Sequence, residues 1–447
     1  MKTFNRILNN IRLAFFPIAY GLSGALIGGT LNRVLIADIG LPASLVGLFF
    51  AVPLLVSPIR VWLGYRSDGF PIFGKRREPY IVLGALLIGL GVTAATMLSI
   101  KIAQSSTAMI IGGILAFSLY GIGRNLGHNT FQALLSDRFD DNQKSRAITL
   151  YEVATLLGLV VGAGGLGKAL EIYDPVRMVN VALGVAVIVF LLALFAALWQ
   201  EPRGEKQVVA AEKSRAIPFK DVLSKYVLAD KQVRLFFMLV FFTFIGTLAQ
   251  DVLLEPYGAL VLNMPVGETT RLTAYWGIGV MIAMLLSSIF LLKWMGFLRL
   301  MRIGMISSIV VFLGLIIVGW SGNPSIFKGL IFVMGLGTGL AGAGMLSGVI
   351  SFTTAVRAGM LMGVWGVANM VGHAFGSLMG GGIVDLVRGI TGGNAFAAYA
   401  AVFAMEVVML VIALVLSTRL NMDSSRARIE ESRVLDGFET QQMGIRS

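Results

Sequence analysis

The chain has 447 residues, of which 56% are hydrophobic and only 13% are charged. Soluble domains average about 25% charged residues, so this composition excludes a soluble protein and indicates a polytopic membrane protein. The formal charge of +12 is concentrated between the apolar stretches, which favours a basic surface beside the membrane and argues against nucleic-acid binding, and the lack of cysteine excludes disulfides and thiolate metal sites.

Twelve apolar stretches follow one another, each about long enough to cross a hydrocarbon core of ~30 Å. Of the 36 Lys and Arg residues, 28 fall at the N-terminus, in the even-numbered connections or in the C-terminal tail, six fall in odd-numbered connections, and two lie within spans. The positive-inside rule therefore predicts that both termini are cytoplasmic. The expected spans are 13–36, 43–63, 80–100, 107–135, 146–167, 178–199, 235–257, 272–292, 303–320, 329–350, 358–386 and 395–418.

The longest polar interruption, about 201–234, divides these spans six and six. A Gly-x-Gly pair at Gly121 recurs at Gly335, and an Arg-Ala pair at Arg146 recurs at Arg357, at nearly equal offsets. Such duplicated halves indicate the major facilitator architecture, although glycine-rich membrane helices can produce the same recurrence by chance.

The expected fold is therefore an all-α membrane protein with twelve transmembrane helices in two pseudo-symmetric six-helix bundles. Residues 1–200 would form the N-terminal bundle and 235–420 the C-terminal bundle. The linker 201–234 carries apolar residues at helical spacing after Pro218, which predicts an amphipathic helix on the membrane surface or beneath the bundle ends. Residues 421–447 are expected to form a mobile cytoplasmic tail.

The connection between the second and third spans is similar to a loop pattern of facilitator transporters, through Gly64, Asp68, Gly74, Lys75 and Arg76. An acid at a helix end can accept from a neighbouring helix N-terminus or from an arginine, and can thereby latch one conformation. The spacing is longer than usual and the matching connection 293–302 has no acid, so only this first latch is predicted. A basic loop that orients the chain in the membrane is the simpler interpretation.

Charged side chains at bilayer depth cost on the order of 3 kcal/mol, so they are expected to be paired or to face a cavity. Arg124 and Glu152 lie on consecutive spans, where an interhelical pair is geometrically feasible. Asp251 and Glu255 lie four residues apart and share a helical face, which can meet Arg271 or a polar ligand; a rigid helix cap is the alternative. The candidates for an intramembrane pair or gate are Arg124, Glu152, Asp251, Glu255, Arg271 and Glu406.

Both histidines of the chain, His128 and His373, fall within spans, one in each half. A neutral imidazole can donate a lone pair to the magnesium of a porphyrin-like ring, which makes both residues candidate pigment ligands. Asn129 and Asn369 are further candidates, and a histidine that packs between helices is the alternative. The chain has no phosphate-binding loop, no zinc-binding motif and no catalytic constellation, so we expect neither a metal site nor an enzyme.

Two segments carry a more specific resemblance. The seventh span and its exit read Gln250-Asp251-Val252-Leu253-Leu254-Glu255-Pro256-Tyr257-Gly258, and the eleventh ends Gly380-Gly381-Gly382-Ile383-Val384-Asp385. These segments are similar to the PucC/LhaA family, the bacteriochlorophyll-delivery branch of the major facilitator superfamily. Span four departs from the purple-bacterial pattern, since Arg124 and Asn125 stand where a Thr-rich run is expected. Because Pro256 cannot donate a backbone hydrogen bond, the seventh span is predicted to end or break there.

The resemblance implies a membrane carrier or assembly factor that delivers chlorophyll or bacteriochlorophyll to light-harvesting or reaction-centre complexes. Its implied partners are membrane lipid, antenna or reaction-centre subunits and pigment-synthesis enzymes, in the photosynthetic or cytoplasmic membrane of a phototrophic bacterium. No cofactor other than the pigment cargo is expected. Two alternatives stay open: a proton-coupled transporter of small solutes, with Glu152, Asp251 or Glu406 as the titrating group, and a scaffold for photosystem subunits that transports nothing.

Overall fold

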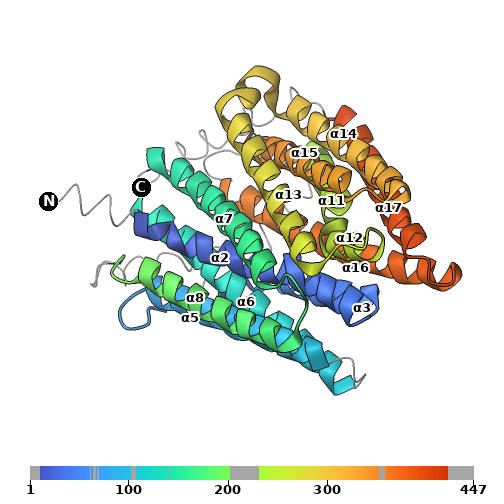
Figure 1. Cartoon of the computed structure of the whole chain (residues 1–447). Helices are drawn as coiled ribbons and strands as arrows, with labels where there is room; N and C mark the ends of the chain where they lie inside the picture. Colours follow the sequence, from blue (N-terminus) through green and yellow to red (C-terminus); the bar gives the residue numbers. More distant parts are fainter. Residues whose placement is uncertain are drawn as a thin grey trace.

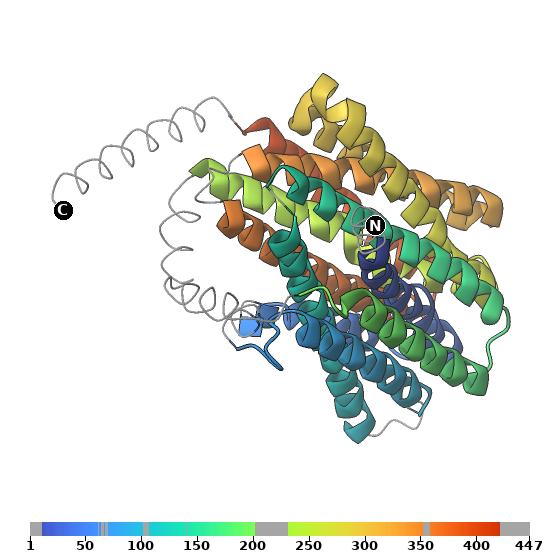
Figure 2. The ribbon, with the colours of Figure 1, turned by 90° about the vertical axis from the view of Figure 1, so that its left-hand side faces the viewer.

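The computed structural model is a bundle of long helices and describes residues 11–60, 62, 63, 67, 70–101, 107–139, 141–201, 231–351 and 358–420 (Figure 1). Figure 2 shows the same bundle turned by 90°, with the long helices running alongside one another. The predicted linker helix and the predicted tail fall outside the described residues.

The described residues of the first half form six long or apolar helical segments. In the first of these segments, α2 is followed by two π-helical turns, η1 and η2. The elements are α2 (Phe15–Leu26), η1 (Ile27–Leu31), η2 (Val34–Asp38), α3 (Ala43–Leu55), α5 (Glu78–Lys101), α6 (Thr107–Arg138), α7 (Asp141–Ala169) and α8 (Pro175–Ala197).

In the second half, the first segment changes from α-helix to 3-10 helix and back to α-helix. The elements are α11 (Lys231–Leu248), η5 (Ala249–Val252), α12 (Leu254–Leu260), α13 (Val266–Leu286), η6 (Ser287–Leu291), α14 (Leu292–Ser321), α15 (Pro324–Ser351), α16 (Ala358–Ile390) and α17 (Ala395–Thr418).

Among the described residues, ten helices are long and apolar enough to cross a membrane, which confirms a polytopic membrane protein. One of these, Val266–Ser321, has 56 residues and contains both α13 and α14. Its direction changes at Gly296, whose φ of 72° and ψ of 164° are accessible only to glycine. A shorter apolar helix, Ala43–Leu55, lies between the first two of the ten. The exact number of twelve spans stays a prediction.

The helices of the two halves repeat one set of contacts. In the first half α5 packs on α6 and α8, and α2 packs on α7 and α8; in the second half α14 packs on α15 and α17, and α11 packs on α16 and α17. The halves meet through two further pairs that also correspond, α3 with α16 and α7 with α13. Figure 1 shows the two groups side by side, with the blue-to-green helices on one side and the yellow-to-red helices on the other.

In each of these two helix pairs, a glycine allows the two backbones to approach closely. A Cβ on Gly381 of α16 would lie 2.3 Å from the Ala43 carbonyl oxygen of α3, and a Cβ on Gly267 of α13 would lie 2.5 Å from the Gly167 carbonyl oxygen of α7. Helix backbones approach this closely in membranes only where small residues line the interface. The glycine run of α16 therefore positions the two halves around the space between them.

At one end of the bundle, the starts of α2 and α5 lie close to the end of α8. The Arg12 guanidinium donates to the carbonyl oxygens of Phe195 (2.6 Å) and Leu198 (2.8 Å). The Glu201 carboxylate accepts from the backbone nitrogen of Glu78 (2.9 Å), and the Glu78 carboxylate accepts in return from the backbone nitrogen of Glu201 (2.7 Å). The starts of α2 and α5 thus lie beside the end of α8, as an even number of crossings requires.

Candidate functional site

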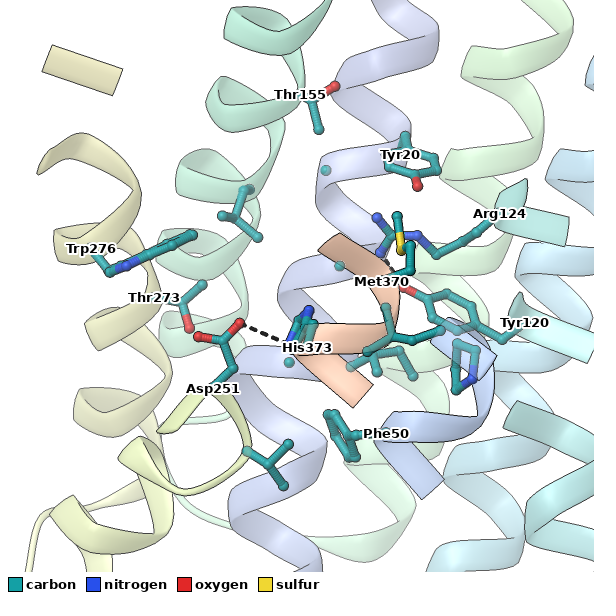
Figure 3. Close-up of a pocket in the computed structure, with 18 of the residues that line it drawn as sticks. Tyr20, Phe50, Tyr120, Arg124, Thr155, Asp251, Thr273, Trp276, Met370 and His373 are labelled. Carbon is teal, nitrogen blue, oxygen red and sulfur yellow. Dashed lines mark hydrogen bonds and ion pairs between the residues drawn. The ribbon is translucent and has the colours of Figure 1, made fainter. Parts of the chain in front are cut away.

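A cavity of about 380 Å³ lies between the two halves. Helices α2, α3, α6 and α7 supply one wall, and η5, α12, α13, α15 and α16 supply the other. Figure 3 shows Tyr20, Tyr120 and Arg124 facing Asp251 and Trp276 across this space, with His373 between them. A concave site lined mainly by apolar groups with a few converging polar ones is the usual form of a ligand pocket.

The break in the seventh predicted span places two acids on the cavity wall. Pro256 stands in the first turn of α12, where its missing N–H is not needed, and the α-helical geometry fails just before it, from Leu248 to Leu253. The span does break, but the break lies several residues before Pro256, and Pro256 itself stands within α12. The break turns Asp251 and Glu255 toward the cavity, which both of them line.

Glu406 on α17 satisfies the backbone at this break. Its carboxylate is fully buried, and one oxygen accepts from the backbone N–H of Gln250 at 2.8 Å. Its other oxygen has no hydrogen-bond partner in the described structure. Since lipid cannot solvate a freed N–H group, the broken helix needs such an acceptor. Glu406 does not line the cavity, so its observed contact is structural.

The wall from the second half is acidic and hydrogen-bonded. The Asp251 carboxylate lies 3.3 Å from Nε2 of His373. The Glu255 carboxylate accepts from the amide nitrogen of Asn32 (2.8 Å) and from the hydroxyl of Thr273 (2.9 Å). These bonds tie the α12 acid to the first half of the chain through Asn32 and hold both carboxylates in place.

The wall from the first half is basic and aromatic. The Arg124 guanidinium lies 3.9 Å from the centroid of the Tyr20 ring and donates to the Tyr120 hydroxyl at 2.7 Å. Arg60 donates through Nε to the Asn125 side chain at 3.2 Å. In the described part of the chain neither guanidinium lies within 4 Å of a carboxylate, so the feasible pair between Arg124 and Glu152 is not formed. The reason is the direction of Arg124, which points between the two tyrosines.

The histidine and asparagine candidates divide between two environments. His373 and Asn369 line the cavity one helical turn apart on α16. His128 lies outside the lining, with its Nδ1 2.6 Å from the Tyr151 hydroxyl, and Asn129 donates to the carbonyl oxygen of Arg60 at 3.4 Å. The structure therefore brings one candidate of each type to the cavity and packs the other between helices.

Arg271, one of the possible partners of Asp251 and Glu255, forms no ion pair with either of them among the described residues. It packs against Gly167 at the contact between α7 and α13, where a Cβ on Gly167 would come within 2.8 Å of the Arg271 side chain. Glu255 instead has neutral partners, and Asp251 has a histidine.

Two residues of the predicted loop latch, Gly64 and Asp68, lie outside the described residues. Gly74 forms a tight turn with a φ of 73°, Lys75 pairs with Glu78, and the side chain of Arg76 is buried. The acids that join helix ends at this end of the bundle are Glu78 and Glu201, which the sequence patterns did not single out.

Sequence reasoning also missed the neutral groups of the cavity. Tyr20 and Tyr120 hold Arg124, and Asn32 and Thr273 hold Glu255. These neutral side chains form no recognisable sequence motif, so nothing in their spacing marks them. Only the positions of the neighbouring helices reveal them.

The fold and the cavity together define a multi-pass membrane protein with a central cavity between its two halves. The family model described as "PUCC protein" matches residues 30–425, and the chain therefore belongs to this family. This match confirms the resemblance seen in the sequence and the predicted class, a multi-pass integral membrane protein of a phototrophic bacterium.

Curated relatives cover about three fifths of the chain. A "Protein PucC" of Cereibacter sphaeroides is 32% identical over 286 residues, which span 62% of this chain and 62% of that protein. An "Uncharacterized protein in puhA-bchM intergenic region" of Rhodobacter capsulatus is 30% identical over 287 residues, 62% of this chain and 59% of that protein. A "Bacteriochlorophyll synthase 44.5 kDa chain" of the same species is 26% identical over 278 residues, 62% and 63% of the two chains.

Solved structures of solute transporters share the fold. A variant of the nucleoside transporter NupG superposes with a TM-score of 0.74 at 13% identity, over 92% of this chain and 99% of that one. A D-xylose-proton symporter gives a TM-score of 0.68 at 15% identity, over 90% and 97% of the two chains. These neighbours confirm the predicted all-helical fold of the major facilitator type.

Proposed function

We propose that the chain is a non-enzymatic membrane carrier or assembly factor. It delivers chlorophyll or bacteriochlorophyll to light-harvesting or reaction-centre complexes, or assists their assembly. Family membership supports this proposal, together with relatives whose names refer to PucC and to bacteriochlorophyll synthase. The observation that carries it is the placement of His373 in the wall of the central cavity.

His373 has the surroundings of a positioned ligand. Histidines that bind metals usually donate their second ring nitrogen to a carboxylate, which fixes the tautomer and the ring orientation. Asp251 stands 3.3 Å from Nε2 of His373, so an Nε2 proton directed at Asp251 leaves the Nδ1 lone pair free for the magnesium of a chlorin. Asn369, one turn earlier on the same helix, can add a hydrogen bond to the same cargo.

The proposal places the chain across the membrane twelve times with both termini in the cytoplasm. The ten candidate spans supply this number when Val266–Ser321 is divided at Gly296 and the short Ala43–Leu55 is added. The repeated helix contacts support a division into bundles of residues 1–200 and 235–420. The end that bears Arg12, Glu78 and Glu201 is then the cytoplasmic end.

The size of the cavity limits how the cargo is held. Ligand pockets range from about 300 to 1,000 Å³, so 380 Å³ is near the lower limit. A pigment with a long hydrocarbon tail exceeds such a space, so the tail extends between helices into lipid. The partners proposed for this arrangement are membrane lipid, antenna or reaction-centre subunits and pigment-synthesis enzymes.

Deletion of the gene in its phototrophic host tests the proposal. The expected result is a loss of light-harvesting or reaction-centre absorption that the intact gene restores. Normal accumulation of both complexes in a deletion strain that has no compensating paralogue would contradict it.

The cavity also favours a second candidate, a proton-coupled transporter of small solutes. A space of 380 Å³ suits a small polar molecule, and Asp251 and Glu255 supply carboxylates on its wall. Proton-dependent uptake of a polar solute into proteoliposomes, by protein that retains no pigment, would favour this candidate over the first.

A further inference from the structure

Two arginines of the cavity wall, Arg60 and Arg124, have no carboxylate within 4 Å among the described residues, although Glu152 is near enough to Arg60 for electrostatic attraction. Arg60 and Arg124 both contribute to the wall, and the contacts of both with neighbouring side chains are to neutral groups, Asn125 for one and two tyrosines for the other. Charged side chains at membrane depth are costly and mark functional sites when the protein does not pair them. An anionic ligand would supply the close charged partner that neither guanidinium has among the described residues.

Neighbouring side chains fix the Arg124 guanidinium in a position that suits the binding of an anion. Its guanidinium stacks on the ring of Tyr20, and Nη1 donates to the hydroxyl of Tyr120. A Cβ on Gly24 would lie 3.3 Å from the same Nη1, so glycine at this position gives the guanidinium its room. An arginine fixed in this way loses little further freedom on binding, and its planar fork matches a carboxylate.

The opposite wall determines the direction of the ligand. Asp251 lies across the cavity from Arg124 and disfavours an anionic group on its own side. His373 and Asn369 stand on the wall of the second half and offer a lone pair and an amide. A molecule with one acidic end and one electron-accepting centre therefore fits in a single orientation.

We propose that Arg124 and Arg60 bind the carboxylate of an anionic ligand at the first-half wall of the cavity. If the function proposed above holds, this ligand is a chlorin acid whose side-chain carboxylate is not esterified. A small organic acid has the same recognition chemistry.

The test is a fluorescence titration of the purified full-length protein in detergent with a chlorin carboxylic acid and with its methyl ester. The wild type is expected to bind the acid about tenfold more tightly than the ester, since a hydrogen-bonded charge pair contributes about that factor. Arg124→Gln should reduce the preference to less than about twofold and keep the affinity for the ester, which also shows that the variant is folded. Arg177→Gln is the matched control, because this exposed arginine stands at the start of α8 outside the cavity and should leave the preference unchanged.

Equal affinity of the wild type for acid and ester would overturn the proposal, as would an unchanged preference in Arg124→Gln. If Arg124→Gln does not fold, Arg60→Gln replaces it and must also lower the preference for the acid, and an unchanged preference there would overturn the proposal too.

A competition arm with a small dicarboxylate separates this proposal from the proposed function. Binding of the small acid that depends on Arg124, with no binding of either chlorin, would support the anion site and reject the pigment cargo. Tight binding of both chlorins with no preference would support the pigment cargo and reject the anion site.

Discussion

Replacement of Glu406 tests how the protein maintains a broken helix inside the membrane. Glu406 is fully buried, and its carboxylate accepts the backbone N–H of Gln250 at 2.8 Å where α11 gives way to η5. Glu406→Leu fills a similar space and removes the acceptor, while Glu406→Gln retains a carbonyl oxygen that can accept the same N–H.

The magnitude follows from the cost of a buried N–H group without a partner, about 1–3 kcal/mol. Local opening around Gln250 should therefore become about 5 to 150 times more frequent in Glu406→Leu. Glu406→Gln should change it by less than about fivefold, because the side-chain carbonyl oxygen of glutamine can accept the same N–H. Amide hydrogen exchange of peptides that cover 246–254 measures this opening.

Unchanged exchange in Glu406→Leu would refute the structural role of Glu406. Equal acceleration in both variants would also refute it, because Glu406→Gln retains an acceptor for the Gln250 N–H and should not open as often as Glu406→Leu. The alternative in which Glu406 carries protons makes a different prediction, namely that Glu406→Gln abolishes transport while the exchange of 246–254 is unchanged.

Two further predictions concern the contact between the halves and the cargo. Gly381→Ala brings a Cβ to 2.3 Å from the backbone of Ala43 and should lower stability by about 1–3 kcal/mol. A Cβ on Gly382 meets nothing within 4 Å, so Gly382→Ala should leave the unfolding temperature in detergent unchanged. Equal unfolding temperatures for the two variants would exclude a tight contact at Gly381. His373→Ala should lower the chlorin absorption of protein purified from the host, whereas His128→Ala should retain this absorption because His128 lies outside the cavity. Unchanged spectra for both variants would contradict pigment ligation by histidine.

The sequence predicted the membrane architecture well because hydrophobic length and basic connections are repeated many times along the chain. It also predicted the break near Pro256, since proline has a fixed local effect on a helix. It did not predict that the break begins near Leu248, because that start depends on the acceptor that Glu406 supplies from α17.

The site was less predictable because partners across helices have no fixed sequence separation. A pair between Arg124 and Glu152 on the next span was feasible from the sequence, and the structure instead places Arg124 against Tyr20, which lies more than a hundred residues earlier. Asp385 illustrates the same difficulty, since its carboxylate accepts from the backbone nitrogens of Ala43 and Ser44 at the start of α3 in the other half.

The pigment content of gently purified protein tests most directly whether the cavity between the halves holds the cargo. Gly28 lines the cavity and a Cβ there meets nothing within 4 Å, so Gly28→Phe should fill the space without disturbing a neighbour. Gly184→Phe is the control, because Gly184 is exposed on α8 and also has nothing within 4 Å of a Cβ. We expect a chlorin absorption band in the wild type and in Gly184→Phe, and its loss in Gly28→Phe. An undiminished band in Gly28→Phe, or no chlorin in the wild type, would contradict the account.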